Sequence, residues 1–201
     1  MANNLKNRTR TRDLVLLAVF TALVVILQFL PIQIPGGIFS ITLVLPVIVI
    51  GVAICGKWAG AWLGFVFATV VMLTGGADFF LFMNPPYTYI TTPLIVYVKG
   101  IGAGLVAGIV YDAIKNKNHT VASIGAAVVS PIVNTGIYLI GCFLFFKDTV
   151  DAWLQGAENM SAFLFISLGL GNFLIELAVN LVLCPVIIRL VDLVVKKKIS
   201  R

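Results

Sequence analysis

A small group of polar residues interrupts the long apolar segments in the second half of the chain. The residues are Lys99, Asn134, Tyr138, Asn172 and Glu176. Asn134 and Tyr138 are four residues apart, as are Asn172 and Glu176, so each pair shares one face of a helix. A polar group inside a bilayer is costly and needs a partner, a cavity or a ligand. We therefore expect these residues to line a binding pocket that opens outward.

Each of these residues also has a purely structural interpretation. Lys99 could extend its ammonium group to lipid headgroups, and Asn134 and Asn172 could hydrogen-bond neighbouring helices. Glu176 lies too deep to reach the membrane surface, so it is protonated, paired or directed at a ligand. An ion pair with Lys99 is the main alternative to a ligand-binding role. Asn180 extends the polar face of Glu176 by one more turn.

Groups that could perform catalysis are scarce. The only histidine, His119, falls in a predicted cytoplasmic loop, and neither paired carboxylates nor a Cys/His set occurs at metal or nucleophile spacing. Cys55, Cys142 and Cys184 lie in or beside apolar runs without CxxC spacing, so we interpret them as buried packing thiols. The sequence predicts that this chain is not an enzyme and holds no metal or cofactor.

Two glycine motifs resemble nucleotide-binding loops only in their letters. Residues 51–57 read GVAICGK, but Trp58 stands where a phosphate-binding loop has the Ser or Thr that binds magnesium. Residues 102–107 read GAGLVA, but no strand precedes them. A simpler pattern has a period of four residues and consists of Gly100, Gly104 and Gly108. This stripe predicts close packing against another helix.

The composition predicts which elements carry these residues. The chain is 60% hydrophobic and 11% charged, whereas an average soluble domain has roughly 45 to 50% and 25%. We expect one domain over residues 1–201, an all-α integral membrane protein that forms a six-transmembrane-helix bundle. The predicted helices are Asp13–Leu30, Thr42–Cys55, Trp58–Thr74, Pro93–Ala113, Val121–Phe146 and Ala162–Val194. The second is short and contains Pro46, so it should be irregular or packed within the bundle.

The distribution of charge predicts the topology. Basic residues occur at both chain ends, at Lys57 and in the loop from Lys115 to His119, whereas the intervening loops are uncharged or acidic on balance. Because positive charge concentrates in cytoplasmic loops, all four basic segments share one side only with six crossings. We expect a multi-pass protein of the cell membrane with both termini in the cytoplasm. Topology explains the net charge of +6 better than nucleic-acid binding does.

Two of the predicted outer loops differ from ordinary connectors. Residues 31–40 are an apolar alternation broken by Pro and Gly, and residues 75–92 form a long loop that contains Asn84 and Tyr87. Long structured loops often act as lids. We expect a lid-like outer loop in which Asn84 and Tyr87 approach the ligand, with two ordinary surface loops as the alternative.

Short motifs in the first half of the chain resemble those of a known family. Residues 18–22 read AVFTA, residues 39–43 read FSITL, and residues 56–60 read GKWAG, with Gly51 before them. Together with six predicted helices, these motifs resemble the substrate-binding (S) components of energy-coupling factor (ECF) vitamin transporters. The resemblance covers nearly the whole chain and is greatest to pantothenate-type members.

The resemblance implies partners and a location for the site. It implies a complex with a transmembrane coupling protein and two ATPase subunits, which hydrolyse ATP in place of this chain. It also implies that Ala18 and Ala22 face the coupling protein. The family's vitamin lies near the outer side, among the last three helices, which is where charge and depth place the five polar residues.

The choice of substrate rests on the polar groups. Among the family's vitamins we favour pantothenate, because Lys99 could neutralise its carboxylate while Asn134, Asn172 and Tyr138 meet its amide and hydroxyls. A pyridine or pyrimidine vitamin held by Glu176 is the alternative. A different class of function also stays open, namely a stand-alone secondary transporter or channel in which Glu176 is a proton site.

Overall fold

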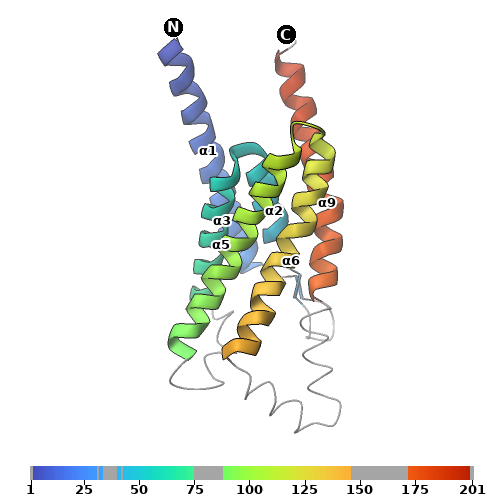
Figure 1. Ribbon diagram of the computed structural model, residues 1–201. Coiled ribbons are helices and arrows are strands. Elements are labelled where there is room, and N and C mark those ends of the chain that lie inside the picture. The colour runs from blue at the N-terminus through green and yellow to red at the C-terminus, as the bar shows by residue number, and fades with distance from the viewer. Residues whose placement is uncertain are drawn as a thin grey trace.

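The computed structural model describes residues 2–30, 32–33, 40–41, 43–74, 88–145 and 172–199. Its helices are α1 (Ala2–Phe29), α2 (Val44–Cys55), α3 (Lys57–Leu73), α5 (Thr88–Ile114), α6 (His119–Phe145) and α9 (Asn172–Ile199). Two short strands, β1 (Ile32–Gln33) and β2 (Ser40–Ile41), pair antiparallel, with Ile32 opposite Ile41. The described helices form the bundle in Figure 1, so the predicted helical architecture is confirmed apart from this strand pair.

The short helix α2 lies in the centre of the bundle, where it packs against α1, α3, α5, α6 and α9. Its sequence is apolar on every side, which is the pattern of a helix buried all around. Eight of its twelve residues are buried. Pro46 stands in the first turn, where its missing N–H breaks no helical hydrogen bond. The prediction that this helix is packed within the bundle is confirmed.

The helices α3 and α5 pack backbone against backbone along a row of glycines. A Cβ atom at Gly60 would collide with the carbonyl group of Gly104, and one at Gly64 with that of Gly100. Gly108 continues the row against the backbone of Lys57. Only residues without a side chain permit this approach, so the predicted glycine stripe is confirmed as a helix contact.

Several described helices have the character of membrane spans. Three segments are long and apolar enough to cross a membrane: Thr11–Phe29, Thr88–Ile114 and His119–Phe145. The helices α2 and α3 are apolar but shorter. These lengths and compositions support a membrane protein, whereas the count of six crossings stays a prediction.

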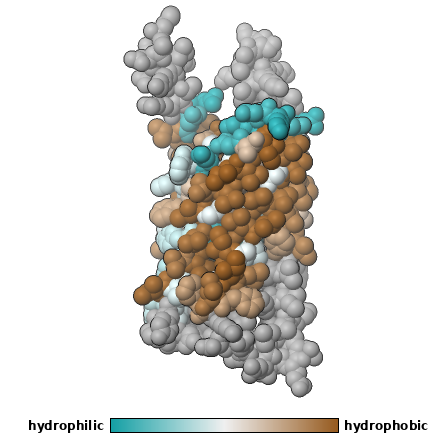
Figure 2. Space-filling view, in the orientation of Figure 1, coloured by the Kyte–Doolittle hydropathy of each residue, from teal (hydrophilic) through white to brown (hydrophobic). Residues whose placement is uncertain are grey.

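The four basic segments gather at one end of the bundle, here termed the basic end. Figure 1 shows the start of α1, the α2–α3 turn, the α5–α6 turn and the end of α9 at this end. Hydrophilic residues lie there in Figure 2, above a hydrophobic belt. The two described chain ends therefore lie on the same side, as an even number of crossings requires. Which side of the membrane the basic end faces stays a prediction.

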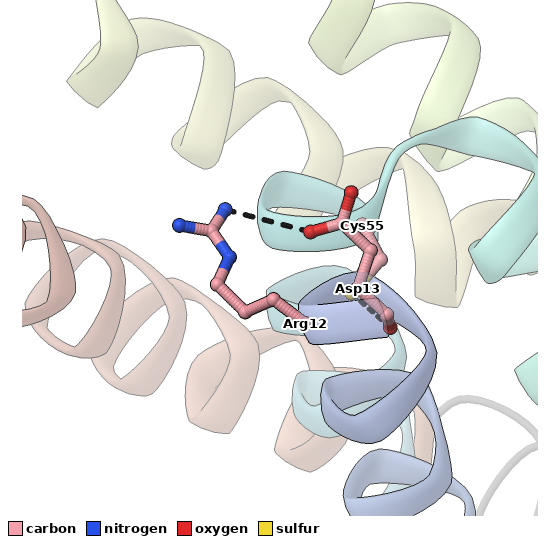
Figure 3. A network of polar contacts seen from close by, with 3 residues as sticks. All are labelled: Arg12, Asp13 and Cys55. Carbon is pink, nitrogen blue, oxygen red and sulfur yellow. Dashed lines mark hydrogen bonds and ion pairs between the residues drawn. The ribbon is translucent and has the colours of Figure 1, made fainter. Parts of the chain in front are cut away.

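Polar contacts define the helix ends at the basic end. The Sγ of Cys55, the last residue of α2, donates to the backbone carbonyl of Asp13 on α1 at 3.9 Å, and the Arg12 guanidinium lies 3.4 Å from the Asp13 carboxylate (Figure 3). The Oδ1 of Asn118 accepts hydrogen bonds from the backbone N–H groups of Thr120 and Val121, at 2.9 and 3.2 Å. This cap explains why α6 begins directly after Asn118.

Within the described residues, three helix boundaries differ from the prediction by more than two residues, and the predicted start of the last helix at Ala162 lies outside them. The helix α1 begins at Ala2 rather than Asp13, and α9 continues to Ile199 rather than Val194, because a helix already formed extends at little cost into polar flanks. The helix α5 begins at Thr88. The prediction that this helix starts at Pro93 is wrong, because the proline stands inside α5. Residues 88–92 are therefore helical and do not belong to the predicted loop.

Candidate binding site

Lys99 and Tyr138 meet between α5 and α6. The Nζ of Lys99 lies 5.4 Å from the centroid of the Tyr138 ring, and both side chains are partly buried. The two helices pack closely here, because a Cβ atom at Gly141 of α6 would press against Ile95 of α5. A cation over an aromatic face is attracted by the ring's quadrupole. Tyr138 therefore helps to hold the lysine ammonium beside α6.

Asn134 lies one turn from Tyr138 on α6 and is the most deeply buried of the predicted pocket residues whose side chains are described. Asn134 is 8% exposed, and its Oδ1 has no hydrogen-bond partner among the described residues. An unpaired buried oxygen of this kind costs about 1 to 3 kcal/mol. A ligand that donates a hydrogen bond to Asn134 would remove this cost, whereas the interhelical interpretation requires a partner within the protein.

The helix α9 carries the remaining two predicted residues. Asn172 is its first residue, and Glu176 follows one turn later with a partly buried side chain. The side chain of Asn172 lies outside the described part of the chain. Cys184 of α9 and Ala126 of α6 share one core cluster. The two helices run in opposite directions (Figure 1), so Glu176 and Asn134 each lie two turns beyond this cluster, away from the basic end.

The structure thus brings Lys99 and Tyr138 into contact and places Asn134 one turn from them. Glu176 lies on the neighbouring helix α9, which packs against α6, two turns beyond the same core cluster as Asn134. Asn84 and Tyr87, the predicted lid residues, lie outside the described residues. The arrangement can present one cation, one phenol and one unpaired amide to a small polar molecule.

The two alanines of α1 lie apart from these polar residues. Ala18 and Ala22 are both exposed on the outer face of α1. Small exposed side chains at a spacing of four residues allow a second helix to approach closely. The helix α1 can therefore provide a docking surface without disturbing the polar residues of α5, α6 and α9.

Two further buried polar residues lie deeper in the bundle. Ser130 and Asn180 have no exposed surface, and the Ser130 Oγ and Asn180 Nδ2 atoms have no hydrogen-bond partner within the described residues. Sequence reasoning places Asn180 on the polar face of its helix but does not single out Ser130, because a helical serine usually bonds to its own backbone. The spacing of four residues between Ser130 and Asn134 is the signal that could have identified it.

The two glycine motifs are not nucleotide sites. Gly51 lies within α2, and Gly56, with φ of +92°, forms the turn to α3. A phosphate-binding loop connects a strand to a helix, whereas this segment connects two helices. The second motif, residues 102–107, lies within α5.

Comparison with known proteins identifies the family. No curated protein sequence matches the chain. One family model, described as the substrate-specific component of ECF transporters, matches residues 12–188. This range includes α2, α3, α5 and α6 in full and every predicted pocket residue. Because the match covers nearly the whole length, the chain belongs to the family of substrate-specific components of ECF transporters.

Proposed function

We propose that this chain captures pantothenate near the end of the bundle opposite the basic end and presents it for ATP-driven uptake across the cell membrane. The observation that carries the proposal is the contact of Lys99 with Tyr138, one turn from the buried amide of Asn134. A cation and an unpaired amide then lie at neighbouring turns of one site. Pantothenate has a carboxylate for the cation, and an amide and hydroxyls for Asn134.

The carboxylate of the substrate is assigned to Lys99. A carboxylate that leaves water loses its hydration and needs a paired cation in the apolar interior. The lysine ammonium is held beside α6 by the Tyr138 ring. A cationic pyridine or pyrimidine vitamin would instead require the carboxylate of Glu176, so the charge of the bound ligand distinguishes the two substrates.

Uptake is assigned to a complex. The family match supports association with an ECF module, in which we assign one transmembrane coupling protein and two ATPase subunits. The exposed face of α1 at Ala18 and Ala22 is the proposed contact with the coupling protein. In this arrangement the chain itself binds the vitamin and lipid, and ATP hydrolysis takes place in the partners.

Two measurements on the purified chain test this function. Native mass spectrometry should show retained pantothenate, and calorimetric titration should show saturable binding of pantothenate but not of a pyridine vitamin. Retention of a pyridine vitamin would contradict the substrate. Vesicles that contain this chain alone should bind pantothenate without accumulating it. Accumulation without an ATPase module would contradict the subunit role and favour a stand-alone transporter.

A further inference from the structure

Asn180 lies in the core of the bundle with its amide oxygen toward Cys184. The Sγ of Cys184 lies 3.5 Å from the Asn180 Oδ1 and 3.9 Å from the carbonyl oxygen of Pro46 in the first turn of α2. The amide oxygen of Asn180 is thus the atom that faces Cys184, whose single thiol proton can be donated either to this oxygen or to the Pro46 carbonyl. The Nδ2 donor of Asn180 is then directed elsewhere, and no described residue accepts from it.

Ser130 on α6 departs from the usual behaviour of a helical serine. Ser123, two turns earlier on the same helix, donates its hydroxyl proton to the backbone carbonyl of His119 at 2.7 Å. This is the common arrangement for serine inside a helix. The hydroxyl of Ser130 makes no such bond within the described part of the chain, although the residue has no exposed surface. It is therefore a buried group that can still donate and accept.

The two residues lie one helical turn beyond the same core cluster. Ala126 of α6 and Cys184 of α9 belong to one core cluster. Because the helices are antiparallel (Figure 1), one turn away from the basic end leads from Ala126 to Ser130 and from Cys184 to Asn180. One further turn leads to Asn134 and Glu176, and another to Tyr138. The Ser130 and Asn180 atoms, which have no partner among the described residues, therefore lie inward of the Lys99–Tyr138 contact.

This inner level is chemically different from the level of Lys99. Its groups are a neutral amide donor and a hydroxyl, which suit a neutral hydroxyl or amide of a ligand rather than a carboxylate. The level of Tyr138 lies eight residues from that of Ser130, a rise of roughly 12 Å along α6. A ligand with a charged group at one end and hydroxyls at the other can therefore reach both levels.

We propose that Ser130 and Asn180 form an inner subsite that binds the hydroxyl-bearing end of the substrate, so that the substrate lies with its carboxylate at Lys99 and its terminal hydroxyl toward Asn180. This inference rests on the proposed binding of pantothenate. It adds two specificity-determining residues and a direction of binding. The subsite selects for the hydroxyl because any ligand that lacks it leaves both buried groups unpaired.

Titration of matched protein and ligand variants tests the subsite. The protein variants are Asn180→Leu and Ser130→Ala, with Ser123→Ala as control, because its hydroxyl is already paired. The ligands are pantothenate, an analogue without the terminal hydroxyl, and an analogue whose carboxylate is amidated. Each test variant should bind pantothenate about tenfold more weakly, the value expected for one lost hydrogen bond, and Ser123→Ala should match the wild type.

The pattern across the ligands identifies the contact. The analogue without the hydroxyl should bind Asn180→Leu and the wild type with equal affinity. Amidation of the ligand's carboxylate should lower the affinity of both proteins by the same factor. Melting temperatures without ligand should be unchanged or higher in both test variants, because an unpaired buried group has been removed. A structural role would lower these melting temperatures and would overturn the proposal.

The remaining outcomes separate the inner subsite from the proposed function. If the wild type binds pantothenate and both test variants bind it with the same affinity, the inner subsite alone is overturned. The Ser130 and Asn180 atoms would then bond to ordered water instead of the ligand. If amidation of the carboxylate weakened binding to the wild type but not to Asn180→Leu, the carboxylate would lie at Asn180. That result would overturn the proposed orientation. A wild type that binds no pantothenate would overturn the proposed function, and the orientation with it.

Discussion

The Nε1 of Trp62 on α3 donates a hydrogen bond to the Oγ1 of Thr21 on α1 at 3.1 Å. Thr21 in turn donates to the carbonyl oxygen of Leu17 at 2.8 Å. Thr21 stands between the exposed residues Ala18 and Ala22. A side-chain bond from α3 therefore anchors the segment of α1 that carries the proposed docking face.

Bulky residues on this face should uncouple binding from uptake. The double variant Ala18→Trp, Ala22→Trp prevents close approach of a partner helix while leaving α5, α6 and α9 unchanged. We expect pantothenate binding like that of the wild type and loss of uptake in cells that contain the ECF module. Val19→Trp, which alters an exposed neighbour, provides a control for size alone. Normal uptake by the double variant at equal expression would disprove this assignment of the face.

The glycine contact between α3 and α5 should be sensitive to a single methyl group. Gly104→Ala places a Cβ atom against the backbone of Gly60, and overpacking of this kind costs about 1 to 3 kcal/mol. Gly136→Ala is the matched control, because a Cβ atom there meets no atom within 4 Å. Thermal unfolding in detergent should show a lower melting temperature for Gly104→Ala and no decrease for Gly136→Ala. Equal melting temperatures would contradict the backbone contact.

The orientation of the bundle is tested by accessibility of single cysteines. The parent protein should have its three natural cysteines replaced. Cysteines at positions 116 and 200 should react with an impermeant reagent only from the cytoplasmic side, and one at position 156 only from outside. Labelling of position 156 from the cytoplasm would contradict the count of six crossings.

The prediction of the fold was most successful for the apolar helix α2 and for the glycine stripe of α5, because each pattern favours a single kind of packing. The apolar sequence of α2 predicted burial on all sides, and the period of Gly100, Gly104 and Gly108 predicted a close helix contact; both are observed. The predicted start of α5 was wrong, because the helix begins at Thr88 and contains Pro93 in its interior.

The pocket could be predicted only in part. Lys99 and Tyr138 are conspicuous in apolar segments, and their contact follows from the register of α5 against α6. The role of Ser130 depends on a hydrogen bond that it does not make within the described residues. The spacing of four residues from Asn134 is its one sequence signal, and the different bonding of Ser123, which donates to the carbonyl oxygen of His119, follows from the packing around each serine.

The charge of Glu176 should matter little for an anionic substrate. Glu176→Gln keeps the size and hydrogen-bonding ability of the side chain and removes its charge. We expect the affinity for pantothenate to change by less than about tenfold, because a neutral hydrogen bond contributes about 1 kcal/mol. Calorimetric titration provides the measurement. A decrease of several orders of magnitude would indicate that a cation is bound, as the pyridine or pyrimidine alternative requires.

The pairing of a substrate carboxylate with Lys99 is the central claim, and titration of Lys99→Ala with pantothenate tests it most directly. Removing one partner of a buried ion pair costs about 3 to 5 kcal/mol, so the affinity should fall by roughly two to four orders of magnitude. Lys115→Ala is the control, because Lys115 pairs with Asp112 at the basic end and should leave the affinity unchanged. Equal pantothenate affinity in Lys99→Ala and the wild type would contradict the account.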